Sequence, residues 1–208
     1  MLENVEVFTQ SSICIHGTKT IYLDPYQVPK EFHDADIIFI THAHYDHFSE
    51  EDILKVRKED TILVAPKDVV TQLGHLFPSN QLYAVEPYQT LEIEGLTIRT
   101  VPAYNVLKSY HPRSAGWVGY VICFDGVTYY DAGDTDALKE NESIACDVAF
   151  IPIGGTFTMD WNEASQFVNH LHPKMVVPIH YGSIVGRKED AVSFQNQLDS
   201  DILCVIKL

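Results

Sequence analysis

Three histidines and one aspartate stand close together in the segment 42–47. Imidazole and carboxylate groups bind a zinc ion at roughly 2.0–2.2 Å. A turn-like loop can direct neighbouring groups of this kind to adjacent points. The spacing therefore predicts a loop that serves two metal ions, with one pair of ligands aimed at each. The first pair is His42 with His44, and the second is Asp46 with His47.

Two more candidate ligands lie farther along the chain, and each follows a predicted strand. The histidine segment itself follows residues 36–40, an apolar run that is typical of a strand buried on both faces. Asp134 comes just after the β-rich segment 127–131, and His180 directly follows residues 175–179. Open α/β folds build their sites at the carboxyl ends of strands. The three segments are therefore predicted to form one site.

The elements that must position these residues are predicted from apolar periodicity and turn residues. Strands dominate early in each half of the chain and helices late. This order predicts an α/β fold, a four-layer αββα sandwich of two packed sheets with helices outside. Without an internal linker, residues 1–208 are expected to form a single domain. The predicted strands are 5–9, 12–16, 20–23, 36–40, 61–65, 91–93, 96–101, 117–124, 127–131, 146–153, 175–179 and 202–207; the predicted helices are 67–73, 189–198, one that begins after Ser49 and one that runs from the capping residue Asp160 to Leu171.

Composition narrows the class of partner. The formal net charge of −15 would repel a nucleic-acid backbone, which proteins bind mainly through Lys and Arg. No apolar run approaches the roughly 18 residues of a membrane-spanning helix. The four cysteines are widely spaced and no signal-peptide pattern precedes them, so reduced thiols in a cytoplasmic protein are expected. The expected partner is a small molecule, not a nucleic acid or a membrane.

The order of the candidate ligands resembles the metallo-β-lactamase superfamily of hydrolases. The pattern of that superfamily is H-x-H-x-D-H, then a histidine, then an aspartate after a strand, then a last histidine. The resemblance covers nearly the whole chain and is closest to a compact branch that includes sugar-phosphate lactonase-like proteins and phospholipase D-like phosphodiesterases. The ligands that it implies are His42 and His44 for a first metal, Asp46, His47 and His180 for a second, and Asp134 for both.

The sequence departs from this pattern at its second position. Many members of the superfamily have a histidine soon after the strand equivalent to 96–101, but this chain has Asn105 there. The nearest histidine is His111. We expect His111 to complete the first metal site, with Asn105 or solvent as the alternative ligand.

The resemblance implies two divalent metal ions and a hydrolytic reaction. The histidine-rich first motif favours zinc, although manganese or iron would tolerate the same mixed set of ligands. Two ions about 3.5–4 Å apart lower the pKa of a bridging water, so a metal-bound hydroxide is the expected nucleophile. Asp46 and Asp134 are the expected catalytic residues because they would fix that water. Asp24 or Asp136 is expected to orient a ligand histidine.

The substrate is predicted less directly, from residues that flank the later ligands. Lys108 and Arg113 are cations close to His111 and could bind an anionic group. Tyr181 and Ser183 follow His180 and could donate hydrogen bonds to developing negative charge. These residues predict a small anionic substrate with a phosphoester, ester or lactone bond.

Other functions stay open at this point. A thiolester hydrolase of the glyoxalase II type and a ribonuclease Z-like nuclease share the opening motif, but a helical extension for glutathione and a basic arm for tRNA are not seen in this sequence. A non-catalytic binding protein, in which metal ions only tie loops together, is the alternative from another class. Structural zinc sites often contain cysteine, and none of the four cysteines stands beside the candidate ligands. Symmetric association into a homo-oligomer is compatible with the sequence.

Overall fold

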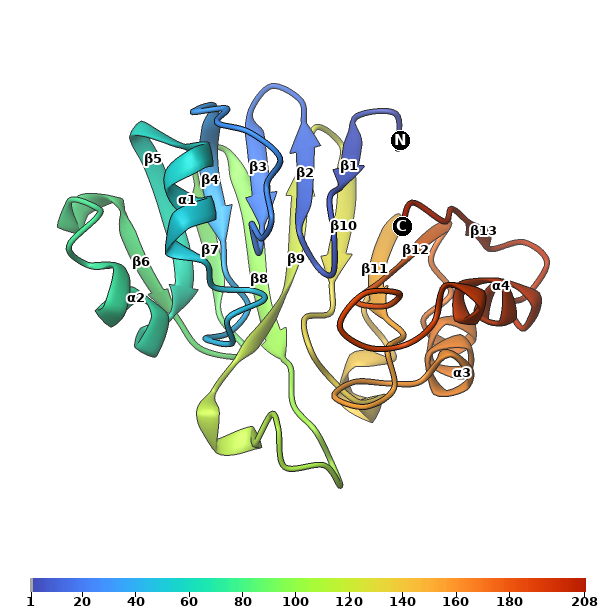
Figure 1. Ribbon diagram of the computed structural model, residues 1–208. Coiled ribbons are helices and arrows are strands. Elements are labelled where there is room, and N and C mark those ends of the chain that lie inside the picture. The colour runs from blue at the N-terminus through green and yellow to red at the C-terminus, as the bar shows by residue number, and fades with distance from the viewer. Residues whose placement is uncertain (1) are drawn as a thin grey trace. The chain divides into compact units, whose positions relative to one another are not determined.

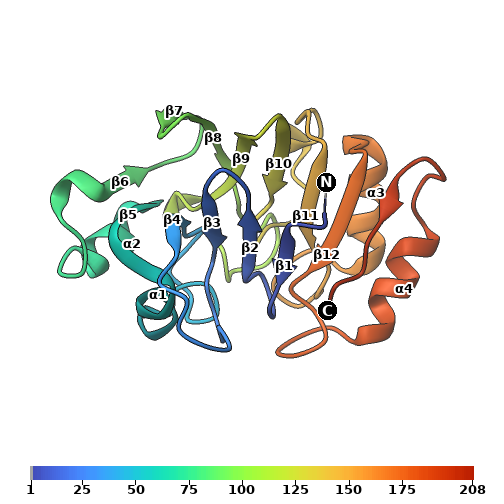
Figure 2. The same ribbon diagram turned by 90° about the horizontal axis from the view of Figure 1, so that it is seen from above.

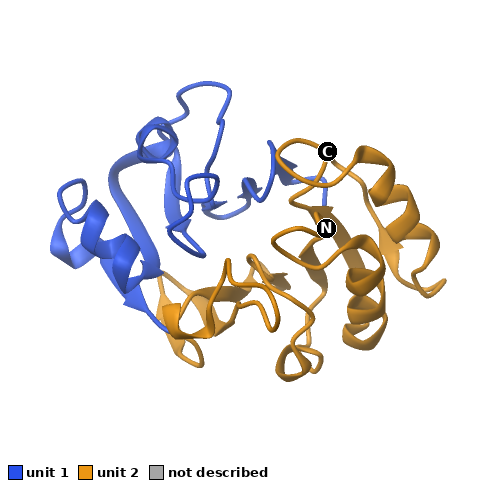
Figure 3. Ribbon diagram, turned by 60° about the horizontal axis from the view of Figure 1, so that its bottom comes forward, with its two compact units in different colours: residues 1–86 blue, residues 87–208 orange. Residues whose placement is uncertain are grey.

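The computed structural model describes residues 2–208 and divides the chain into two compact units. Unit 1 comprises residues 1–86 and unit 2 comprises residues 87–208 (Figure 3). Each unit contains one β-sheet and two α-helices. The mixed α/β fold with two sheets and four helices agrees with the predicted fold class.

Unit 1 is built on a six-stranded sheet in which the strands follow the chain order. Neighbouring strands from the first to the third are antiparallel, and those from the third to the sixth are parallel. The strands are β1 (Val5–Val7), β2 (Ile13–His16), β3 (Thr20–Leu23), β4 (Ala35–Phe39), β5 (Arg57–Pro66) and β6 (Leu82–Val85), and the helices are α1 (Glu50–Val56) and α2 (Lys67–Leu73), with a 3-10 turn at Ser79–Gln81.

Both helices of unit 1 pack apolar side chains against the sheet. Ile53 of α1 and Val69 of α2 belong to one buried cluster with Ile38 and Leu63 of the central strands, and Figure 1 shows α1 alongside β4 and β5. Complete burial of one such side chain contributes about 1.5–3 kcal/mol. This cluster therefore fixes β3 and β4, the two strands whose ends carry the histidine motif and its partners.

Unit 2 is built on a seven-stranded sheet with the order β13-β12-β11-β10-β9-β8-β7. Neighbours from β7 to β10 are antiparallel, and those from β10 to β13 are parallel. The strands are β7 (Thr90–Ile93), β8 (Leu96–Pro102), β9 (Val118–Phe124), β10 (Val127–Asp131), β11 (Val148–Pro152), β12 (Met175–Ile179) and β13 (Leu203–Cys204); the helices are α3 (Trp161–Leu171) and α4 (Lys188–Asn196), with 3-10 turns at Arg113–Ala115 and Lys139–Asn141.

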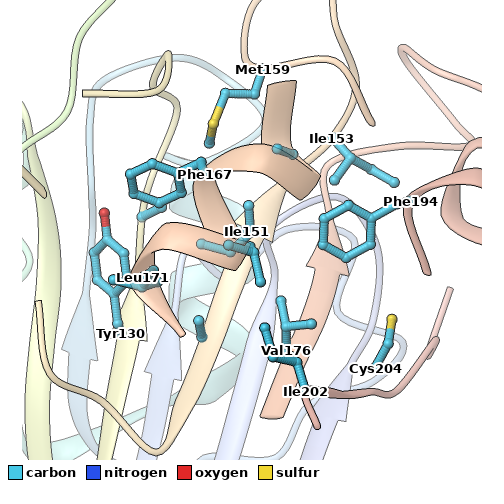
Figure 4. Close-up of a cluster of buried hydrophobic side chains, with 14 of the residues drawn as sticks. Tyr130, Ile151, Ile153, Met159, Phe167, Leu171, Val176, Phe194, Ile202 and Cys204 are labelled. Carbon is cyan, nitrogen blue, oxygen red and sulfur yellow. The ribbon is translucent and has the colours of Figure 1, made fainter. Parts of the chain in front are cut away.

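The helices of unit 2 lie side by side over the parallel strands (Figure 2). Phe167 of α3 and Phe194 of α4 pack with Ile151 of β11 and Val176 of β12 in one buried cluster (Figure 4). The α3 helix begins with the predicted capping box, because the Asp160 side chain accepts from the backbone of the first turn while the Glu163 side chain accepts from the Asp160 backbone. The parallel strands that precede Asp134 and His180 are thus held by a continuous core.

Most predicted elements are confirmed, and the differences have physical reasons. Strand β5 begins at Arg57 instead of at residue 61, because a charged stretch without an apolar signal pairs with β4 across an irregularity in register. Strand β6 was not predicted; it is a short edge strand with half-exposed side chains. The final strand contains only Leu203 and Cys204 instead of residues 202–207, since only these two residues pair with β12. Among residues 2–208, no helix is long and apolar enough to cross a membrane.

Candidate metal centre

In unit 1 the histidine motif stands at the carboxyl edge of the parallel strands. Asp24 directly follows β3, and Thr41 follows β4 by two residues. Because β3 and β4 are parallel, these two positions are neighbours, and the Asp24 backbone amide donates to the Phe39 carbonyl over 2.9 Å. The backbone of Asp24 has φ = 43°, a left-handed conformation that turns its side chain away from the strand direction.

The Asp24 carboxylate orients two of the predicted ligands. It is fully buried and accepts from the Thr41 amide at 2.8 Å, the Thr41 hydroxyl at 2.6 Å and His47 Nδ1 at 2.6 Å. Burial raises the pKa of Asp24, and the interactions with His47 and Thr41 oppose that rise. Since Nδ1 of His47 faces the carboxylate, Nε2 is the nitrogen left to bind a metal. The Thr41 hydroxyl donates to Asp24, so it accepts from His42 Nδ1, 3.0 Å away, and His42 likewise presents Nε2.

The four predicted ligands of unit 1 lie together. His42 Nε2 is 3.0 Å from His44 Nδ1, and His47 Nε2 is 3.8 Å from Asp46 Oδ2. The rings of His42 and His47 are also neighbours, with centroids 4.0 Å apart. A helical-type turn shapes the segment, because the amides of His47 and Phe48 both donate to the His44 carbonyl. The prediction that a turn-like loop gathers these side chains is therefore supported within unit 1.

In unit 2, three predicted ligands meet at the carboxyl edge of another set of parallel strands. Asp134 follows β10 and His180 follows β12, with β11 between them. Asp134 Oδ2 lies 3.3 Å from His111 Nε2 and 3.2 Å from His180 Nε2. All three side chains are nearly or fully buried. Two imidazoles and one carboxylate thus converge on one buried point of unit 2.

A glycine makes room for His180. The backbone of His180 has φ = 56°, an uncommon conformation for a histidine. A Cβ atom on Gly154 would lie only 2.4 Å from the His180 carbonyl oxygen and 3.4 Å from His180 Nδ1. Any side chain at position 154 would therefore displace His180, and this requirement explains a glycine two residues after β11.

The two candidates for the ligand that the sequence left open, His111 and Asn105, have different surroundings. The Asn105 side chain already has partners on both ends of its amide group. Its nitrogen donates to the Phe157 carbonyl at 2.8 Å and to Asp136 at 3.0 Å, while its oxygen faces His111. The ring of His111, in contrast, directs Nε2 at Asp134.

The two cations predicted to bind an anionic substrate are engaged with carboxylates. Lys108 Nζ is 2.7 Å from Asp136 Oδ1 and donates to the Thr158 carbonyl at 2.7 Å. Arg113 stacks on the ring of Tyr104 and lies 3.8 Å from Glu140. The carboxylate of Asp136 therefore binds Lys108 and Asn105 and touches no ligand histidine directly.

The two hydroxyl residues after His180 have different surroundings. Tyr181 is 1% exposed, and its ring belongs to the hydrophobic cluster beneath α3 and α4. Burial raises the pKa of Tyr181. The suggested role of Tyr181 as a donor to substrate is not supported by this placement, because the apolar β12 neighbours draw its ring into the core. Ser183, in the exposed turn after it, presents its side chain at the surface.

Several residues of the site were not found from the sequence. Gln10 donates to Asp46 Oδ2 over 3.5 Å from the turn between β1 and β2, and Gly154 has the packing role described above. Gln10 gives no local signal because its turn lies far from the histidine motif in the sequence. The left-handed backbone of Gln10, φ = 49°, is a property of the folded chain alone.

With this geometry described, the comparisons with known proteins identify the class. The chain matches the family profile of the β-lactamase superfamily domain over residues 4–180. This match covers most of both units. The chain therefore belongs to the metallo-β-lactamase superfamily.

Individual relatives agree with this assignment. The UPF0173 metal-dependent hydrolase of Pyrococcus horikoshii is 33% identical over 192 residues, which cover 86% of this chain and 84% of the relative. A solved structure of a metal-dependent hydrolase from Parabacteroides distasonis has 30% identity and a TM-score of 0.84, and the match covers 98% of this chain and 92% of that one. A metallo hydrolase from Ignicoccus hospitalis, 24% identical with a TM-score of 0.77 over 97% of this chain and 93% of that one, supports the fold alone.

Proposed function

We propose that the chain is a metal-dependent hydrolase that acts as a single catalytic domain and holds two divalent metal ions through the ligands of the superfamily pattern. The observation that carries the proposal is the spacing of donor atoms within each unit. Two atoms that bind one zinc ion tetrahedrally at about 2.05 Å are separated by about 3.3 Å. The closest donor pairs are separated by 3.0 Å in unit 1 and by 3.2 and 3.3 Å in unit 2. The naming of relatives as metal-dependent hydrolases supports the same function.

The chemistry of the donors fits zinc best. The set contains more imidazole nitrogens than carboxylate oxygens, and zinc binds both types, whereas manganese and iron are alternatives for a mixed set. By the superfamily pattern, Asp134 would serve both ions. The proposed ligands are His42, His44 and His111 for the first ion, Asp46, His47 and His180 for the second, and Asp134 for both.

The residues of the chain would orient the ligands, the water and the substrate. Two divalent ions, when bound, supply a Lewis acid and lower the pKa of a water to near neutrality. Asp24 holds the rings of His47 and, through Thr41, His42. The carboxylates of Asp46 and Asp134 would accept hydrogen bonds from the attacking water.

We infer further that the substrate is a small ester or lactone. Lys108 and Arg113 were the residues expected to recognise an anion, and both have carboxylate partners. A phosphodiester would have to compete with Asp136 for the positive charge of Lys108, or with Glu140 for that of Arg113. The net charge of −15 likewise disfavours an anionic polymer such as RNA.

The test combines metal analysis with turnover. Purified protein is supplemented with zinc or manganese, analysed for metal, and assayed on simple lactones and on bis(p-nitrophenyl) phosphate. We expect close to two metals per chain, and Asp134→Ala should lose both metal and turnover. Metal affinity and turnover should each fall by more than the 10–100-fold that removal of an outer partner of a ligand typically causes.

A matched control is Asp147→Ala. Asp147 accepts from the Thr128 amide at 2.9 Å and pairs with Lys174, but it precedes β11 and so lies at the opposite edge of the sheet from Asp134. This variant should keep its metal and turnover. Wild-type protein that takes up no metal under these conditions would show that the ligand assignment is wrong. Two bound metals without turnover of any ester would support the binding-protein alternative.

A further inference from the structure

We infer that Asn105 is a positioning residue that holds His111 in the tautomer with a proton on Nδ1, so that Nε2 is directed at the metal. Asp136 and Lys108 hold Asn105 in turn. The inference rests on the proposed function only in naming a metal as the group that His111 meets. It assigns Asn105, the residue that departs from the superfamily pattern, a role other than that of a ligand.

The orientation of the Asn105 amide follows from its neighbours. The Phe157 carbonyl, 2.8 Å away, can only accept a hydrogen bond, so the atom that faces it must be the amide nitrogen. The same nitrogen donates to the Asp136 carboxylate at 3.0 Å. The amide oxygen therefore points in the opposite direction, toward His111.

The orientation of the amide determines the tautomer of His111. Asn105 Oδ1 lies 3.0 Å from His111 Nδ1 and also accepts from the His111 amide at 3.0 Å. An amide oxygen only accepts, so Nδ1 must carry the proton, and the lone pair of the neutral ring is on Nε2. That atom is the one 3.3 Å from Asp134 Oδ2. Asn105 thus does for His111 what Asp24 does for His47, but without a charge.

The same pair closes the loop that carries His111. The Asn105 amide donates to the His111 carbonyl at 2.7 Å, so the two residues are joined by three hydrogen bonds across the excursion 106–110. The side chain of Leu107 in this excursion is 95% exposed and adds little packing. Ring contacts of Tyr110 with Phe157 and of His111 with Trp117 pack the end of the loop, and the polar contacts at its base set the orientation of the His111 ring.

Asp136 anchors this base to the rest of unit 2. Its carboxylate accepts from Asn105 Nδ2, from the Val106 amide at 2.8 Å and from Lys108 Nζ at 2.7 Å. Lys108 also donates to the Thr158 carbonyl. The segment after β11 thus receives hydrogen bonds from both Asn105 and Lys108, and the lysine neutralises the carboxylate that holds the asparagine.

The experiment compares Asn105→Ala with Asn141→Ala in the full-length protein. Asn141 is a suitable control because it is also buried in unit 2 and donates to the Pro102 carbonyl at 2.9 Å, yet it contacts no candidate ligand. Zinc affinity is measured by competition with a chromophoric chelator. Removal of an outer partner of a metal ligand typically lowers affinity 10–100-fold. We expect Asn105→Ala to lower the affinity for one of the two zinc ions by 10–100-fold. Asn141→Ala should change zinc affinity by less than about threefold.

A spectroscopic readout separates positioning from general stabilisation. Two-bond nitrogen–proton NMR correlations report which ring nitrogen of His111 is protonated in the metal-free protein near pH 7.5. Wild type and Asn141→Ala should show the Nδ1 proton, and Asn105→Ala should show a mixture of tautomers. Asn105→Asp keeps an acceptor at Nδ1, so it should retain the tautomer even where repulsion from Asp136 lowers its thermal stability.

The outcomes distinguish this inference from the proposed function. Failure of wild type to bind zinc would overturn the proposed function. If wild type binds zinc but Asn105→Ala keeps both the Nδ1 proton and the wild-type affinity, the positioning role of Asn105 is wrong. A folded Asn105→Asp protein that shows mixed tautomers would also overturn it, and this variant provides the test if Asn105→Ala does not fold.

Discussion

The two units present their candidate ligands in different ways. Unit 1 takes all four from one short segment, 42–47, whereas unit 2 takes three from separate loops at positions 111, 134 and 180. In unit 1 a single turn after β4 sets their spacing. In unit 2, Asp134 and His180 follow parallel strands at the same edge of the sheet, and the hydrogen bonds between Asn105 and His111 hold the third ligand beside them. A local motif and a tertiary arrangement can thus produce similar donor spacings.

The outer partners of the ligands also differ between the units. Asp24 contributes a buried charge and orients two histidines, one directly and one through Thr41. Asn105 contributes a neutral amide and orients His111 alone. A charged acceptor forms a hydrogen bond roughly twice as strong as a neutral one. We therefore expect zinc affinity to depend more on Asp24, the outer partner in unit 1, than on Asn105, the outer partner in unit 2.

The largest effect in this comparison is expected for Asp24→Asn. Both carboxylate oxygens of Asp24 accept hydrogen bonds, one from the Thr41 amide and the other from the Thr41 hydroxyl and His47 Nδ1. An asparagine has only one acceptor oxygen, so its amide nitrogen must face one of these donors, and His47 and Thr41 lose both the charge and part of the acceptor set that fixes the tautomers. We expect zinc affinity to fall about 100-fold, at the upper end of the range for outer partners, and to a greater degree than in Asn105→Ala. Zinc competition titration of both variants measures the difference.

The control for this comparison is Asp34→Asn. Asp34 is another carboxylate of unit 1, and it accepts from the Tyr22 hydroxyl at 2.9 Å without contact to the histidine motif. Its replacement should leave zinc affinity unchanged. If Asp24→Asn costs less affinity than Asn105→Ala, the charge of the outer partner is not what distinguishes the two units.

The same contrast explains how much the sequence could predict. The motif from His42 to His47 is contiguous, so residue types alone indicated its chemistry. Asp134 and His180 were chosen as candidates because each follows an apolar strand, which is also a local signal. The identity of the remaining candidate could only be narrowed, since the choice between Asn105 and His111 depends on how a long loop closes.

Hydrogen-bond partners across loops were the least predictable part. Asp136 was suggested as an orienting carboxylate, but it acts on Asn105 instead of on a histidine. Lys108 was taken for a substrate-binding cation, although it turns toward Asp136. Tyr181 was expected beside the substrate but packs in the core. The side chains next to a ligand in the sequence can point in different directions. Their directions depend on tertiary packing, which the local sequence does not reveal.

A second, smaller effect concerns the carboxylate that anchors the ligand-bearing edge of unit 1. Asp52 accepts from the amides of Gln27 and Val28, both at 2.9 Å, and pairs with Lys55 at 2.9 Å. Asp136 has a comparable set of donors in unit 2. Hydrogen bonds to a charged group contribute about 1.5–3 kcal/mol, so Asp52→Asn should lower the free energy of unfolding by about that amount at pH 7. Chemical denaturation measures the change.

The pH dependence of this effect has a definite sign. Burial raises the pKa of Asp52. Hydrogen bonds from Lys55, Ser49 and two backbone amides lower it by more than burial raises it, so the pKa of Asp52 lies below its usual value. A depressed carboxyl pKa stabilises the fold above the unfolded value of about 3.9, and this contribution is lost as the pH falls through the folded value. The deficit of Asp52→Asn should therefore be complete at pH 7 and shrink below about pH 4. A constant deficit at every pH would show that the charge of Asp52 is not involved.

The smallest effect is expected for Arg113, which tests the charges beside the ligands. The motif from 42 to 47 contains no cation, whereas Arg113 stands two residues after His111. Its side chain is 67% exposed and its partner Glu140 is 3.8 Å away, so the ion pair should contribute at most about 1 kcal/mol. Arg187, 77% exposed and paired with Asp190 in the same unit, is the matched control.

We expect Arg113→Met and Arg187→Met each to change kcat/KM by less than about threefold for lactones and for bis(p-nitrophenyl) phosphate. An interaction of an arginine with a substrate anion would be charge-assisted, and its loss would cost about 1.5–3 kcal/mol, or roughly 10–150-fold. A loss of that size in Arg113→Met alone, confined to the phosphodiester, would show that this arginine leaves Glu140 to bind an anion. Unit 2 would then supply substrate recognition as well as ligands, and the inference that the substrate is a small ester or lactone would be wrong.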